Sequence, residues 1–156
     1  MKKKDAKQLL AKFSQALKVN LNQLLEPSPK LEQAEALGLR VFFLNGELLL
    51  AEVGTILFPT LIFHQIFPYL PKIVVDMRAV PYVCNGADVM APGVVCIQRD
   101  FDEQDFVLVV DERHEKVLAV AIALVDSKSV RSLKHGRVAK NVHYVSDKLW
   151  NTLKQT

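Results

Sequence analysis

The sequence lacks the uncharged apolar run of about 18 to 20 residues that a membrane-spanning helix requires. Its longest apolar stretch, TILFPTLIFHQIFPYLP (55–71), is interrupted by prolines and a histidine. The N-terminal MKKKDAKQLL (1–10) leads into a polar segment with helical periodicity, whereas a secretory signal peptide continues into an apolar core. We therefore expect a cytoplasmic protein that does not contact a membrane.

The sequence is also poor in the residues and spacings typical of metal sites and catalysis. It contains only two cysteines, Cys84 and Cys96, with no CxxC pair, and its four histidines show no HxxxH spacing. No nucleophile-elbow motif occurs, and GADVMAPG (86–93) lacks the Lys-Ser/Thr ending of a Walker-type phosphate loop. Both cysteines lie in apolar contexts, which predicts buried, reduced thiols and a raised pKa for Cys84. We expect no metal, no cofactor and no enzymatic activity.

The net charge is only +3, which argues against a generic polyanion binder, but the charge is unevenly distributed. Residues 100–115 carry seven acids and a single arginine. Five basic residues then follow at every third position with no acid among them: Lys128, Arg131, Lys134, Arg137 and Lys140. Such a basic stripe is either a solvated face or a surface that follows the phosphates of a nucleic acid.

Residues 1–70 show a helical pattern followed by strands. Apolar residues recur on one side of a helix predicted at 4–19, and a short helical turn at 21–25 ends before a proline. Asn45-Gly46 separates two apolar runs, which predicts a tight hairpin between strands at 40–44 and 47–52. Two prolines bracket a predicted helix at 60–67. This part of the chain is therefore expected to be a small α+β unit.

Residues 71–156 are rich in short apolar runs. Strands are predicted at 72–76, 93–98, 106–110, 117–124 and 138–145, and helical turns at 80–85, from Asp126 or Ser127 to Lys134, and at 147–154. Strands this short and numerous suit a small closed or half-closed barrel. We therefore predict an α+β protein with two domains, at 1–70 and 71–156.

The most unusual segment is GADVMAPGVV (86–95), which places two glycines, an acid and a Met-Ala-Pro corner before a strand. Gly86 and Gly93 would permit close approach of a ligand along a loop with free backbone amides. Asp88 could accept hydrogen bonds from ribose hydroxyls or base amines, and Met90 could offer an apolar platform. In the alternative interpretation, Asp88 caps its own loop and Met90 fills the core.

The segment PKIVVDMRAVPYVCNGADVMAPGVV (71–95) resembles the opening strand, first helix and glycine loop of a PUA domain, an RNA-binding pseudobarrel. The matching positions are Val75-Asp76, Ala79-Val80, Gly86 to Met90 and Pro92-Gly93. LNGELLL (44–50), FPTL (58–61), HQIFPYLP (64–71) and NVHYVSDKLW (141–150) extend the resemblance to the malignant T-cell-amplified sequence family and its archaeal relatives. These proteins carry a small pre-PUA domain ahead of the PUA domain.

The resemblance implies a non-catalytic RNA-binding protein of the translation apparatus, with an α+β pre-PUA domain at 1–70 and a PUA pseudobarrel with two short helices at 71–156. Family members act with density-regulated protein at the small ribosomal subunit and handle tRNA. The expected partners are structured RNA (tRNA or rRNA), the small ribosomal subunit and a density-regulated-protein-like factor, and we expect a monomer. Met77-Arg78 replace a glycine-containing pair of many relatives, and Arg78 adds a candidate phosphate contact.

The predicted RNA surface combines the glycine loop with the basic stripe. Its residues are Arg78, Gly86, Ala87, Asp88, Met90, Pro92, Gly93, Lys128, Arg131, Lys134, Arg137 and Lys140. A second hypothesis is a protein-interaction module, in which strand edges and the apolar segment Phe58–Phe67 dock a translation factor or an RNA-modifying enzyme. RNA contact would then be incidental.

Overall fold

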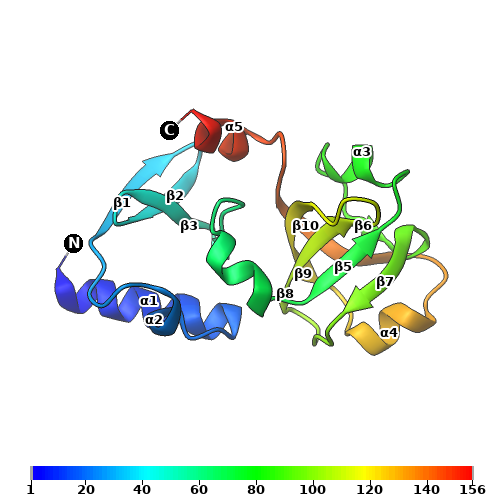
Figure 1. The fold of residues 1–156 in the computed structure, drawn as a ribbon, viewed down its shortest axis with the longest axis horizontal. Coiled ribbons are helices and arrows are strands. Elements are labelled where there is room, and N and C mark those ends of the chain that lie inside the picture. Colours follow the sequence, from blue (N-terminus) through cyan, green and yellow to red (C-terminus); the bar gives the residue numbers. More distant parts are fainter. Residues whose placement is uncertain (1, 156) are drawn as a thin grey trace. The chain divides into compact units, whose positions relative to one another are not determined.

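A computed structural model describes residues 2–155, and the chain divides into two compact units, Met1–Tyr69 and Leu70–Thr156. Each unit has its own β-sheet (Figure 1). Both units mix helices and strands, which confirms the predicted α+β class. None of the helices in the described range is long and apolar enough to cross a bilayer.

The first unit packs one long helix against a four-stranded antiparallel meander. Its helices are α1 (Lys3–Leu17) and α2 (Leu21–Leu24), and its strands, in sheet order, are β1 (Leu31–Ala36), β2 (Leu39–Leu44), β3 (Glu47–Val53) and β4 (Ile56–Pro59). The predicted apolar stripe of α1 is buried at Leu10, Phe13 and Leu17. Phe13 meets Phe42 of β2 edge to face, with ring centroids 5.5 Å apart.

The turn between β2 and β3 forms at Asn45-Gly46, as predicted. Asn45 has a φ of +51° and Gly46 a φ of +85°, so both take the left-handed conformation that a type I′ hairpin requires. Asn45 Oδ1 also accepts a hydrogen bond from the backbone N–H of Lys30 at 2.8 Å. The hairpin turn is therefore hydrogen-bonded to the residue directly before β1.

The segment after β3 differs from the prediction. Residues 56–59 form β4, which pairs only with β3 at the edge of the sheet, where a proline is tolerated because one side of the strand needs no partner. The helix expected at 60–67 is a 3₁₀ helix, η1 (His64–Tyr69), which begins later and includes Pro68.

The apolar segment Phe58–Phe67 lies mostly in the core of the first unit. Phe58, Leu61, Phe63 and Ile66 are all buried. These side chains are already in contact with the protein's own interior and are not available to a partner. The docking hypothesis is therefore wrong for these four side chains, and docking through the strand edges stays a prediction.

The second unit is built on a six-stranded sheet in the order β6-β10-β9-β8-β5-β7. Its elements are β5 (Lys72–Val75), α3 (Val80–Val83), β6 (Val89–Met90), the 3₁₀ helix η2 (Ala91–Gly93), β7 (Val94–Gln98), β8 (Phe106–Asp111), β9 (Val117–Ala123), α4 (Ser127–Ser132), β10 (Arg137–Tyr144) and α5 (Lys148–Lys154). β5 and β8 are parallel, and the other neighbours are antiparallel. The sheet curls into the half-closed barrel that was predicted, with β6 as an additional strand.

The core of the second unit lies inside this curled sheet. Every residue of β8 is buried, and the cluster takes in apolar side chains of β5, β9 and β10. Cys84 packs partly against the cluster, but Cys96 is exposed on β7. The prediction that both thiols are buried is therefore wrong for Cys96, because β7 is an edge strand whose residues are only partly covered.

Two aspartates begin the last helices of this unit. Asp126 Oδ1 accepts a hydrogen bond from the N–H of Ser129 at 2.7 Å and caps α4, which decides between the two predicted caps, Asp126 and Ser127. Asp147 Oδ1 accepts one from the N–H of Trp150 at 2.7 Å and caps α5. The first cap begins the helix that carries Lys128 and Arg131, whereas Arg137 and Lys140 of the basic stripe belong to β10.

Candidate nucleic-acid interface

The glycine loop is held by regular backbone hydrogen bonds. β6 pairs antiparallel with β10, with Met90 opposite Arg137. The backbone amides of Gly86, Ala87 and Ala91 all donate to carbonyl oxygens within the protein. The expectation of a loop with free amides is therefore wrong at these positions, because the short strand and the turn after α3 use their donors.

Asp88 links the glycine loop to the basic stripe. One carboxylate oxygen accepts a hydrogen bond from Arg137 Nη1 at 3.1 Å, and the other accepts one from the backbone N–H of Asn141 at 2.9 Å. The side chain of Asp88 is 23% exposed. Asp88 therefore neither caps its own loop nor stands free to meet a ribose, and its contacts place the loop beside β10.

The two glycines of the loop lie close to neighbouring side chains. Gly86 has a φ of +93°, and a Cβ atom on it would lie 3.1 Å from the Tyr144 hydroxyl oxygen. Gly93 has ordinary backbone, and a Cβ atom there would lie 3.3 Å from the Cβ of Ala79. The protein's own side chains, Tyr144 and Ala79, therefore come close to these glycines, and approach of a ligand to them stays a prediction.

An open groove of about 440 Å³ lies beside α3 and the glycine loop. Six of the predicted site residues line it: Arg78, Ala87, Asp88, Met90, Pro92 and Gly93. Met90 is 47% exposed, so it does not fill the core, and the platform interpretation fits its position. The groove is therefore the part of the predicted surface that the fold brings together.

Tyr82 is a groove residue that the sequence analysis missed. It lines the groove from α3 and is 70% exposed, the highest value among the large hydrophobic side chains of the described residues. Val83, the next residue along α3, is buried, so the helix turns Tyr82 outward. An exposed aromatic ring in an apolar groove is typical of platforms on which bases stack. The sequence feature that could have indicated it is a tyrosine in a single helical turn with valines on its buried side.

Arg78 stands at the rim of the same groove. Its side chain is 93% exposed, and Nη2 lies 3.4 Å from Asp76 Oδ2. Asp76 Oδ1 accepts a hydrogen bond from the N–H of Ala79 at 3.0 Å, so the turn into α3 forms without a glycine at positions 77 and 78. The guanidinium therefore remains accessible to an anion.

The five basic residues of the stripe are all exposed but lie in different surroundings. Arg137 is paired with Asp88, and Arg131 Nη1 lies 3.0 Å from Asp100. Arg131 also lines a second groove, of about 400 Å³, between α4 and β7. Lys134 and Lys140 have no ion-pair partner within residues 2–155. Lys128, Lys134 and Lys140 line neither groove, so the stripe borders the glycine loop only through Arg137.

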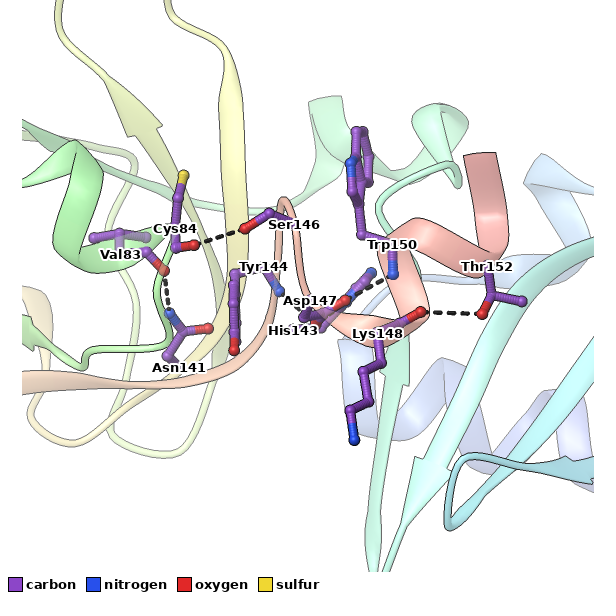
Figure 2. A network of polar contacts seen from close by, with 10 residues as sticks. All are labelled: Val83, Cys84, Asn141, His143, Tyr144, Ser146, Asp147, Lys148, Trp150 and Thr152. Atoms are coloured by element: carbon purple, nitrogen blue, oxygen red, sulfur yellow. Dashed lines mark hydrogen bonds and ion pairs between the residues drawn. The ribbon is translucent and has the colours of Figure 1, made fainter. Parts of the chain in front are cut away.

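Polar contacts join β10 and the turn after it to the C-terminal end of α3 (Figure 2). Asn141 Nδ2 donates to the carbonyl oxygens of Val83 at 3.0 Å and Ala87 at 3.1 Å. Ser146 Oγ donates to the carbonyl oxygen of Cys84 at 2.7 Å. These bonds hold one wall of the groove against the sheet, so α3 and Tyr82 have a fixed support.

A buried histidine and an aspartate form the next part of this network. His143 is fully buried, and its Nδ1 lies 2.7 Å from Asp147 Oδ2. Burial alone would raise the pKa of Asp147, but the hydrogen bond and charge of His143, with the amides of Trp150 and Tyr144, outweigh it and lower the pKa. The carboxylate is therefore kept ionised as the cap of α5.

The groove beside α3 carries side chains that suit binding. Across residues 2–155, no three His, Cys, Asp or Glu side chains are grouped so that they could hold a metal ion. Burial raises the pKa of the Cys84 thiol, which disfavours the thiolate needed for attack. The groove itself presents a guanidinium, an aromatic ring and a thioether, which suit a phosphate and a flat base.

Residues 71–145 match the PUA domain family. An uncharacterized protein of Methanocaldococcus jannaschii is 34% identical to this chain over 152 residues, covering 97% of this chain and 93% of that protein. Translation machinery-associated protein 20 of Schizosaccharomyces pombe is 28% identical over 153 residues, covering 92% and 84%. Malignant T-cell-amplified sequence 1 of Danio rerio is 27% identical over 118 residues, covering 72% and 65%.

Among solved structures, a hypothetical protein from Pyrococcus horikoshii shares 30% identity and superposes with a TM-score of 0.81, covering 98% of this chain and 97% of that one. Similarity along nearly the whole chain, in both sequence and fold, agrees with the resemblance predicted from the motifs.

Proposed function

The chain belongs to the PUA-domain family that includes malignant T-cell-amplified sequence 1, translation machinery-associated protein 20 and archaeal relatives, and on this premise we propose that it binds structured RNA, a tRNA or an rRNA, at the small ribosomal subunit. Membership supports an RNA-binding role associated with translation. The proposed activity is binding without catalysis, carried out in the cytoplasm. A density-regulated-protein-like factor is the proposed protein partner.

The observation that carries the proposal is the composition of the groove beside α3. An exposed arginine, Arg78, stands at its rim, and an exposed tyrosine, Tyr82, and Met90 line its apolar part. Guanidinium groups bind phosphate through paired N–H donors, and aromatic rings stack on bases. This combination fits a nucleotide whose base leaves the helical stack at the edge of a folded RNA.

The basic stripe supplies the second half of the proposed contact. Paired RNA presents phosphates and 2′-hydroxyls while its deep major groove hides the base edges, so lysines that follow the backbone read shape. Lys134 and Lys140 are exposed and have no ion-pair partner in the described part of the chain. Arg137 and Arg131 would exchange their present carboxylate partners, Asp88 and Asp100, for phosphates.

The proposal is tested by measuring the affinity for an initiator tRNA transcript as a function of salt. Lys134→Ala with Lys140→Ala should lower the slope of log K against log salt by about 0.7 to 0.9 for each phosphate that a lysine no longer neutralises. Tyr82→Ala should weaken binding by about 1 to 3 kcal/mol, the worth of one stacked base, and leave the slope unchanged. Arg137 is avoided because its substitution would also disturb Asp88.

Lys12→Ala provides the matched control, since Lys12 is an exposed lysine of α1 outside the proposed surface. It should leave both affinity and slope at their original values. If the lysine pair leaves the slope unchanged and Tyr82→Ala binds as tightly as the original protein, this surface is not the RNA site.

A further inference from the structure

The first unit contains a separate groove of about 670 Å³ between α1 and the segment that leads into β1. Lys3, Ala6, Lys7 and Leu10 line it from α1 at the i, i+3, i+4 and i+7 positions, so they share one side of the helix. Pro29 and Leu31 line it from the opposite wall. None of its lining residues belongs to the surface proposed for RNA.

The groove exists because the apolar side chains on the buried side of α1 are smaller near the start of the helix. Leu10, Phe13 and Leu17 are large and buried against the unit. One turn earlier the stripe continues with Ala6, whose side chain is too short to fill the space before Pro29. The result is an open trough with the buried Leu10 and Leu31 at its base. Its other lining residues include the polar side chains of Asn22, Ser28 and Glu32.

The charged residues that line the trough are three lysines, Lys3, Lys7 and Lys30, and one acid, Glu32. Lys3 and Lys7 are exposed and have no ion-pair partner in the part of the chain that the structure describes. Lys30 lies 3.6 Å from Glu32, but both side chains are more than half exposed, and such surface pairs contribute little. Lys3 is the first residue of α1, where the helix dipole favours negative charge, so an anion bound beside it would be favoured by the dipole as well.

We propose that this trough binds an acidic segment of a partner protein, with aliphatic or aromatic side chains between its carboxylates. The apolar base would take the partner's large side chains, and Lys3, Lys7 and Lys30 would pair with its acids. A peptide fits better than a nucleic acid because none of the described residues lining the trough is aromatic or arginine, so no base could stack there. The proposal is independent of RNA binding by the second unit.

The experiment uses the full chain as bait for a display library of random twelve-residue peptides. The recovered peptides should be rich in Asp and Glu around Leu, Ile or Phe. Binding of a labelled recovered peptide, followed by fluorescence anisotropy, should weaken at least about tenfold in Lys3→Glu with Lys7→Glu, since both rim charges are reversed. Ala6→Trp should abolish binding without changing the charge, because the indole fills the trough.

Lys12→Glu is the control for general charge effects. Lys12 is exposed and lies nine residues after Lys3, about two and a half helical turns, on the opposite side of α1. It should bind the peptide as the original protein does, and thermal unfolding should show that each variant is folded. Should Ala6→Trp fail to fold, the lysine pair decides the result.

Three outcomes would overturn the proposal. The recovered peptides could show no excess of acids, the Lys3/Lys7 variant could bind as tightly as the original protein, or Lys12→Glu could weaken binding as much as that variant does. Self-association that disappears with the same lysines and prevents peptide binding, seen by analytical ultracentrifugation, would assign the trough to a second copy instead.

Discussion

The ring of Tyr144 occupies the space beside Gly86 that a side chain at this position would need. A Cβ atom on Gly86 would lie 3.1 Å from the Tyr144 hydroxyl oxygen and 3.2 Å from two ring carbons. Gly86 also has a φ of +93°, a conformation that residues with a Cβ rarely adopt. Glycine is therefore favoured at this position by two separate features, its backbone conformation and the close approach of Tyr144 from β10.

Gly86→Ala should consequently destabilise the protein by more than backbone strain alone. Gly136→Ala is the matched control, since Gly136 has a φ of +95° and nothing within 4 Å of its would-be Cβ. We expect about 1 kcal/mol of destabilisation at Gly136 from the conformational term. At Gly86 we expect an additional 1 to 3 kcal/mol, roughly the cost of overpacking. Urea unfolding of the two variants measures the difference, and equal destabilisation would show that Tyr144 moves aside freely.

A second prediction concerns Asp88, which holds the loop to β10. Asp88→Ala leaves the backbone N–H of Asn141 and the guanidinium of Arg137 without their acceptor, and should cost about 1 to 3 kcal/mol of unfolding free energy. Asp88→Asn keeps an acceptor oxygen and should cost under about 1 kcal/mol, because the Arg137 pair is solvent-exposed. Equal destabilisation by the two variants in urea unfolding would contradict this division of roles.

Much of the fold was predictable because the relevant information is local. Asn45-Gly46 specifies its own hairpin turn. The Asp126 carboxylate caps α4 by accepting a hydrogen bond from the backbone N–H of Ser129, only three residues further along the chain. The apolar spacing of α1 and the buried runs of β8 and β9 follow the periods of helix and strand. These elements can be predicted without information about the rest of the chain.

The features that the sequence did not predict all depend on contacts between distant segments. β6 is two residues long and exists because β10 pairs with it, and Asp88 meets Arg137 across 49 residues of sequence. β4 ends in a proline and forms because β3 offers it an edge. Tyr82 is an ordinary residue of a short helix until the groove beside it is visible. The sequence names the residues of the groove, but it does not say which of them lie side by side in the folded chain.

The third prediction is a pH dependence at Asp147. The pKa of this carboxyl is lowered in the folded protein, so its ionised form adds stability above the ordinary carboxyl pKa, and that stability disappears as the pH falls through the lowered value. Asp147→Asn should therefore lower the free energy of unfolding at pH 7 by about 1 kcal/mol, comparable with a helix cap or one hydrogen bond. The gap to the original protein should begin to narrow at about pH 4, the ordinary carboxyl pKa, and should close only below the lowered pKa of the folded protein.

The control for Asp147 is Asp126→Asn at the cap of α4. Backbone and side-chain hydrogen bonds from Ser129 lower the pKa of Asp126, but no histidine faces it and it is open to solvent. Its substitution should change the pH profile less than that of Asp147. A gap at Asp147 that stays constant from pH 7 to pH 3 would contradict the assignment.

The fourth prediction uses the two cysteines. Cys96 is exposed on β7, whereas burial raises the pKa of Cys84. Iodoacetamide should therefore alkylate Cys96 much faster than Cys84 at pH 8, as read by peptide mass spectrometry. Comparable rates would show that the unit opens locally around α3.

The alkylation rate of Cys96 also tests whether the basic stripe takes part in RNA binding. Cys96 and Arg131 line one groove between α4 and β7, separate from the groove of Tyr82. If Arg131 binds phosphates, RNA lies across this groove, and tRNA should slow alkylation of Cys96 in a Cys84→Ser variant. High salt should restore the rate, because phosphate contacts weaken as counterions compete. Slow labelling that persists in Arg131→Ala, or a rate unaffected by tRNA, would remove α4 from the footprint and leave RNA to the groove beside α3.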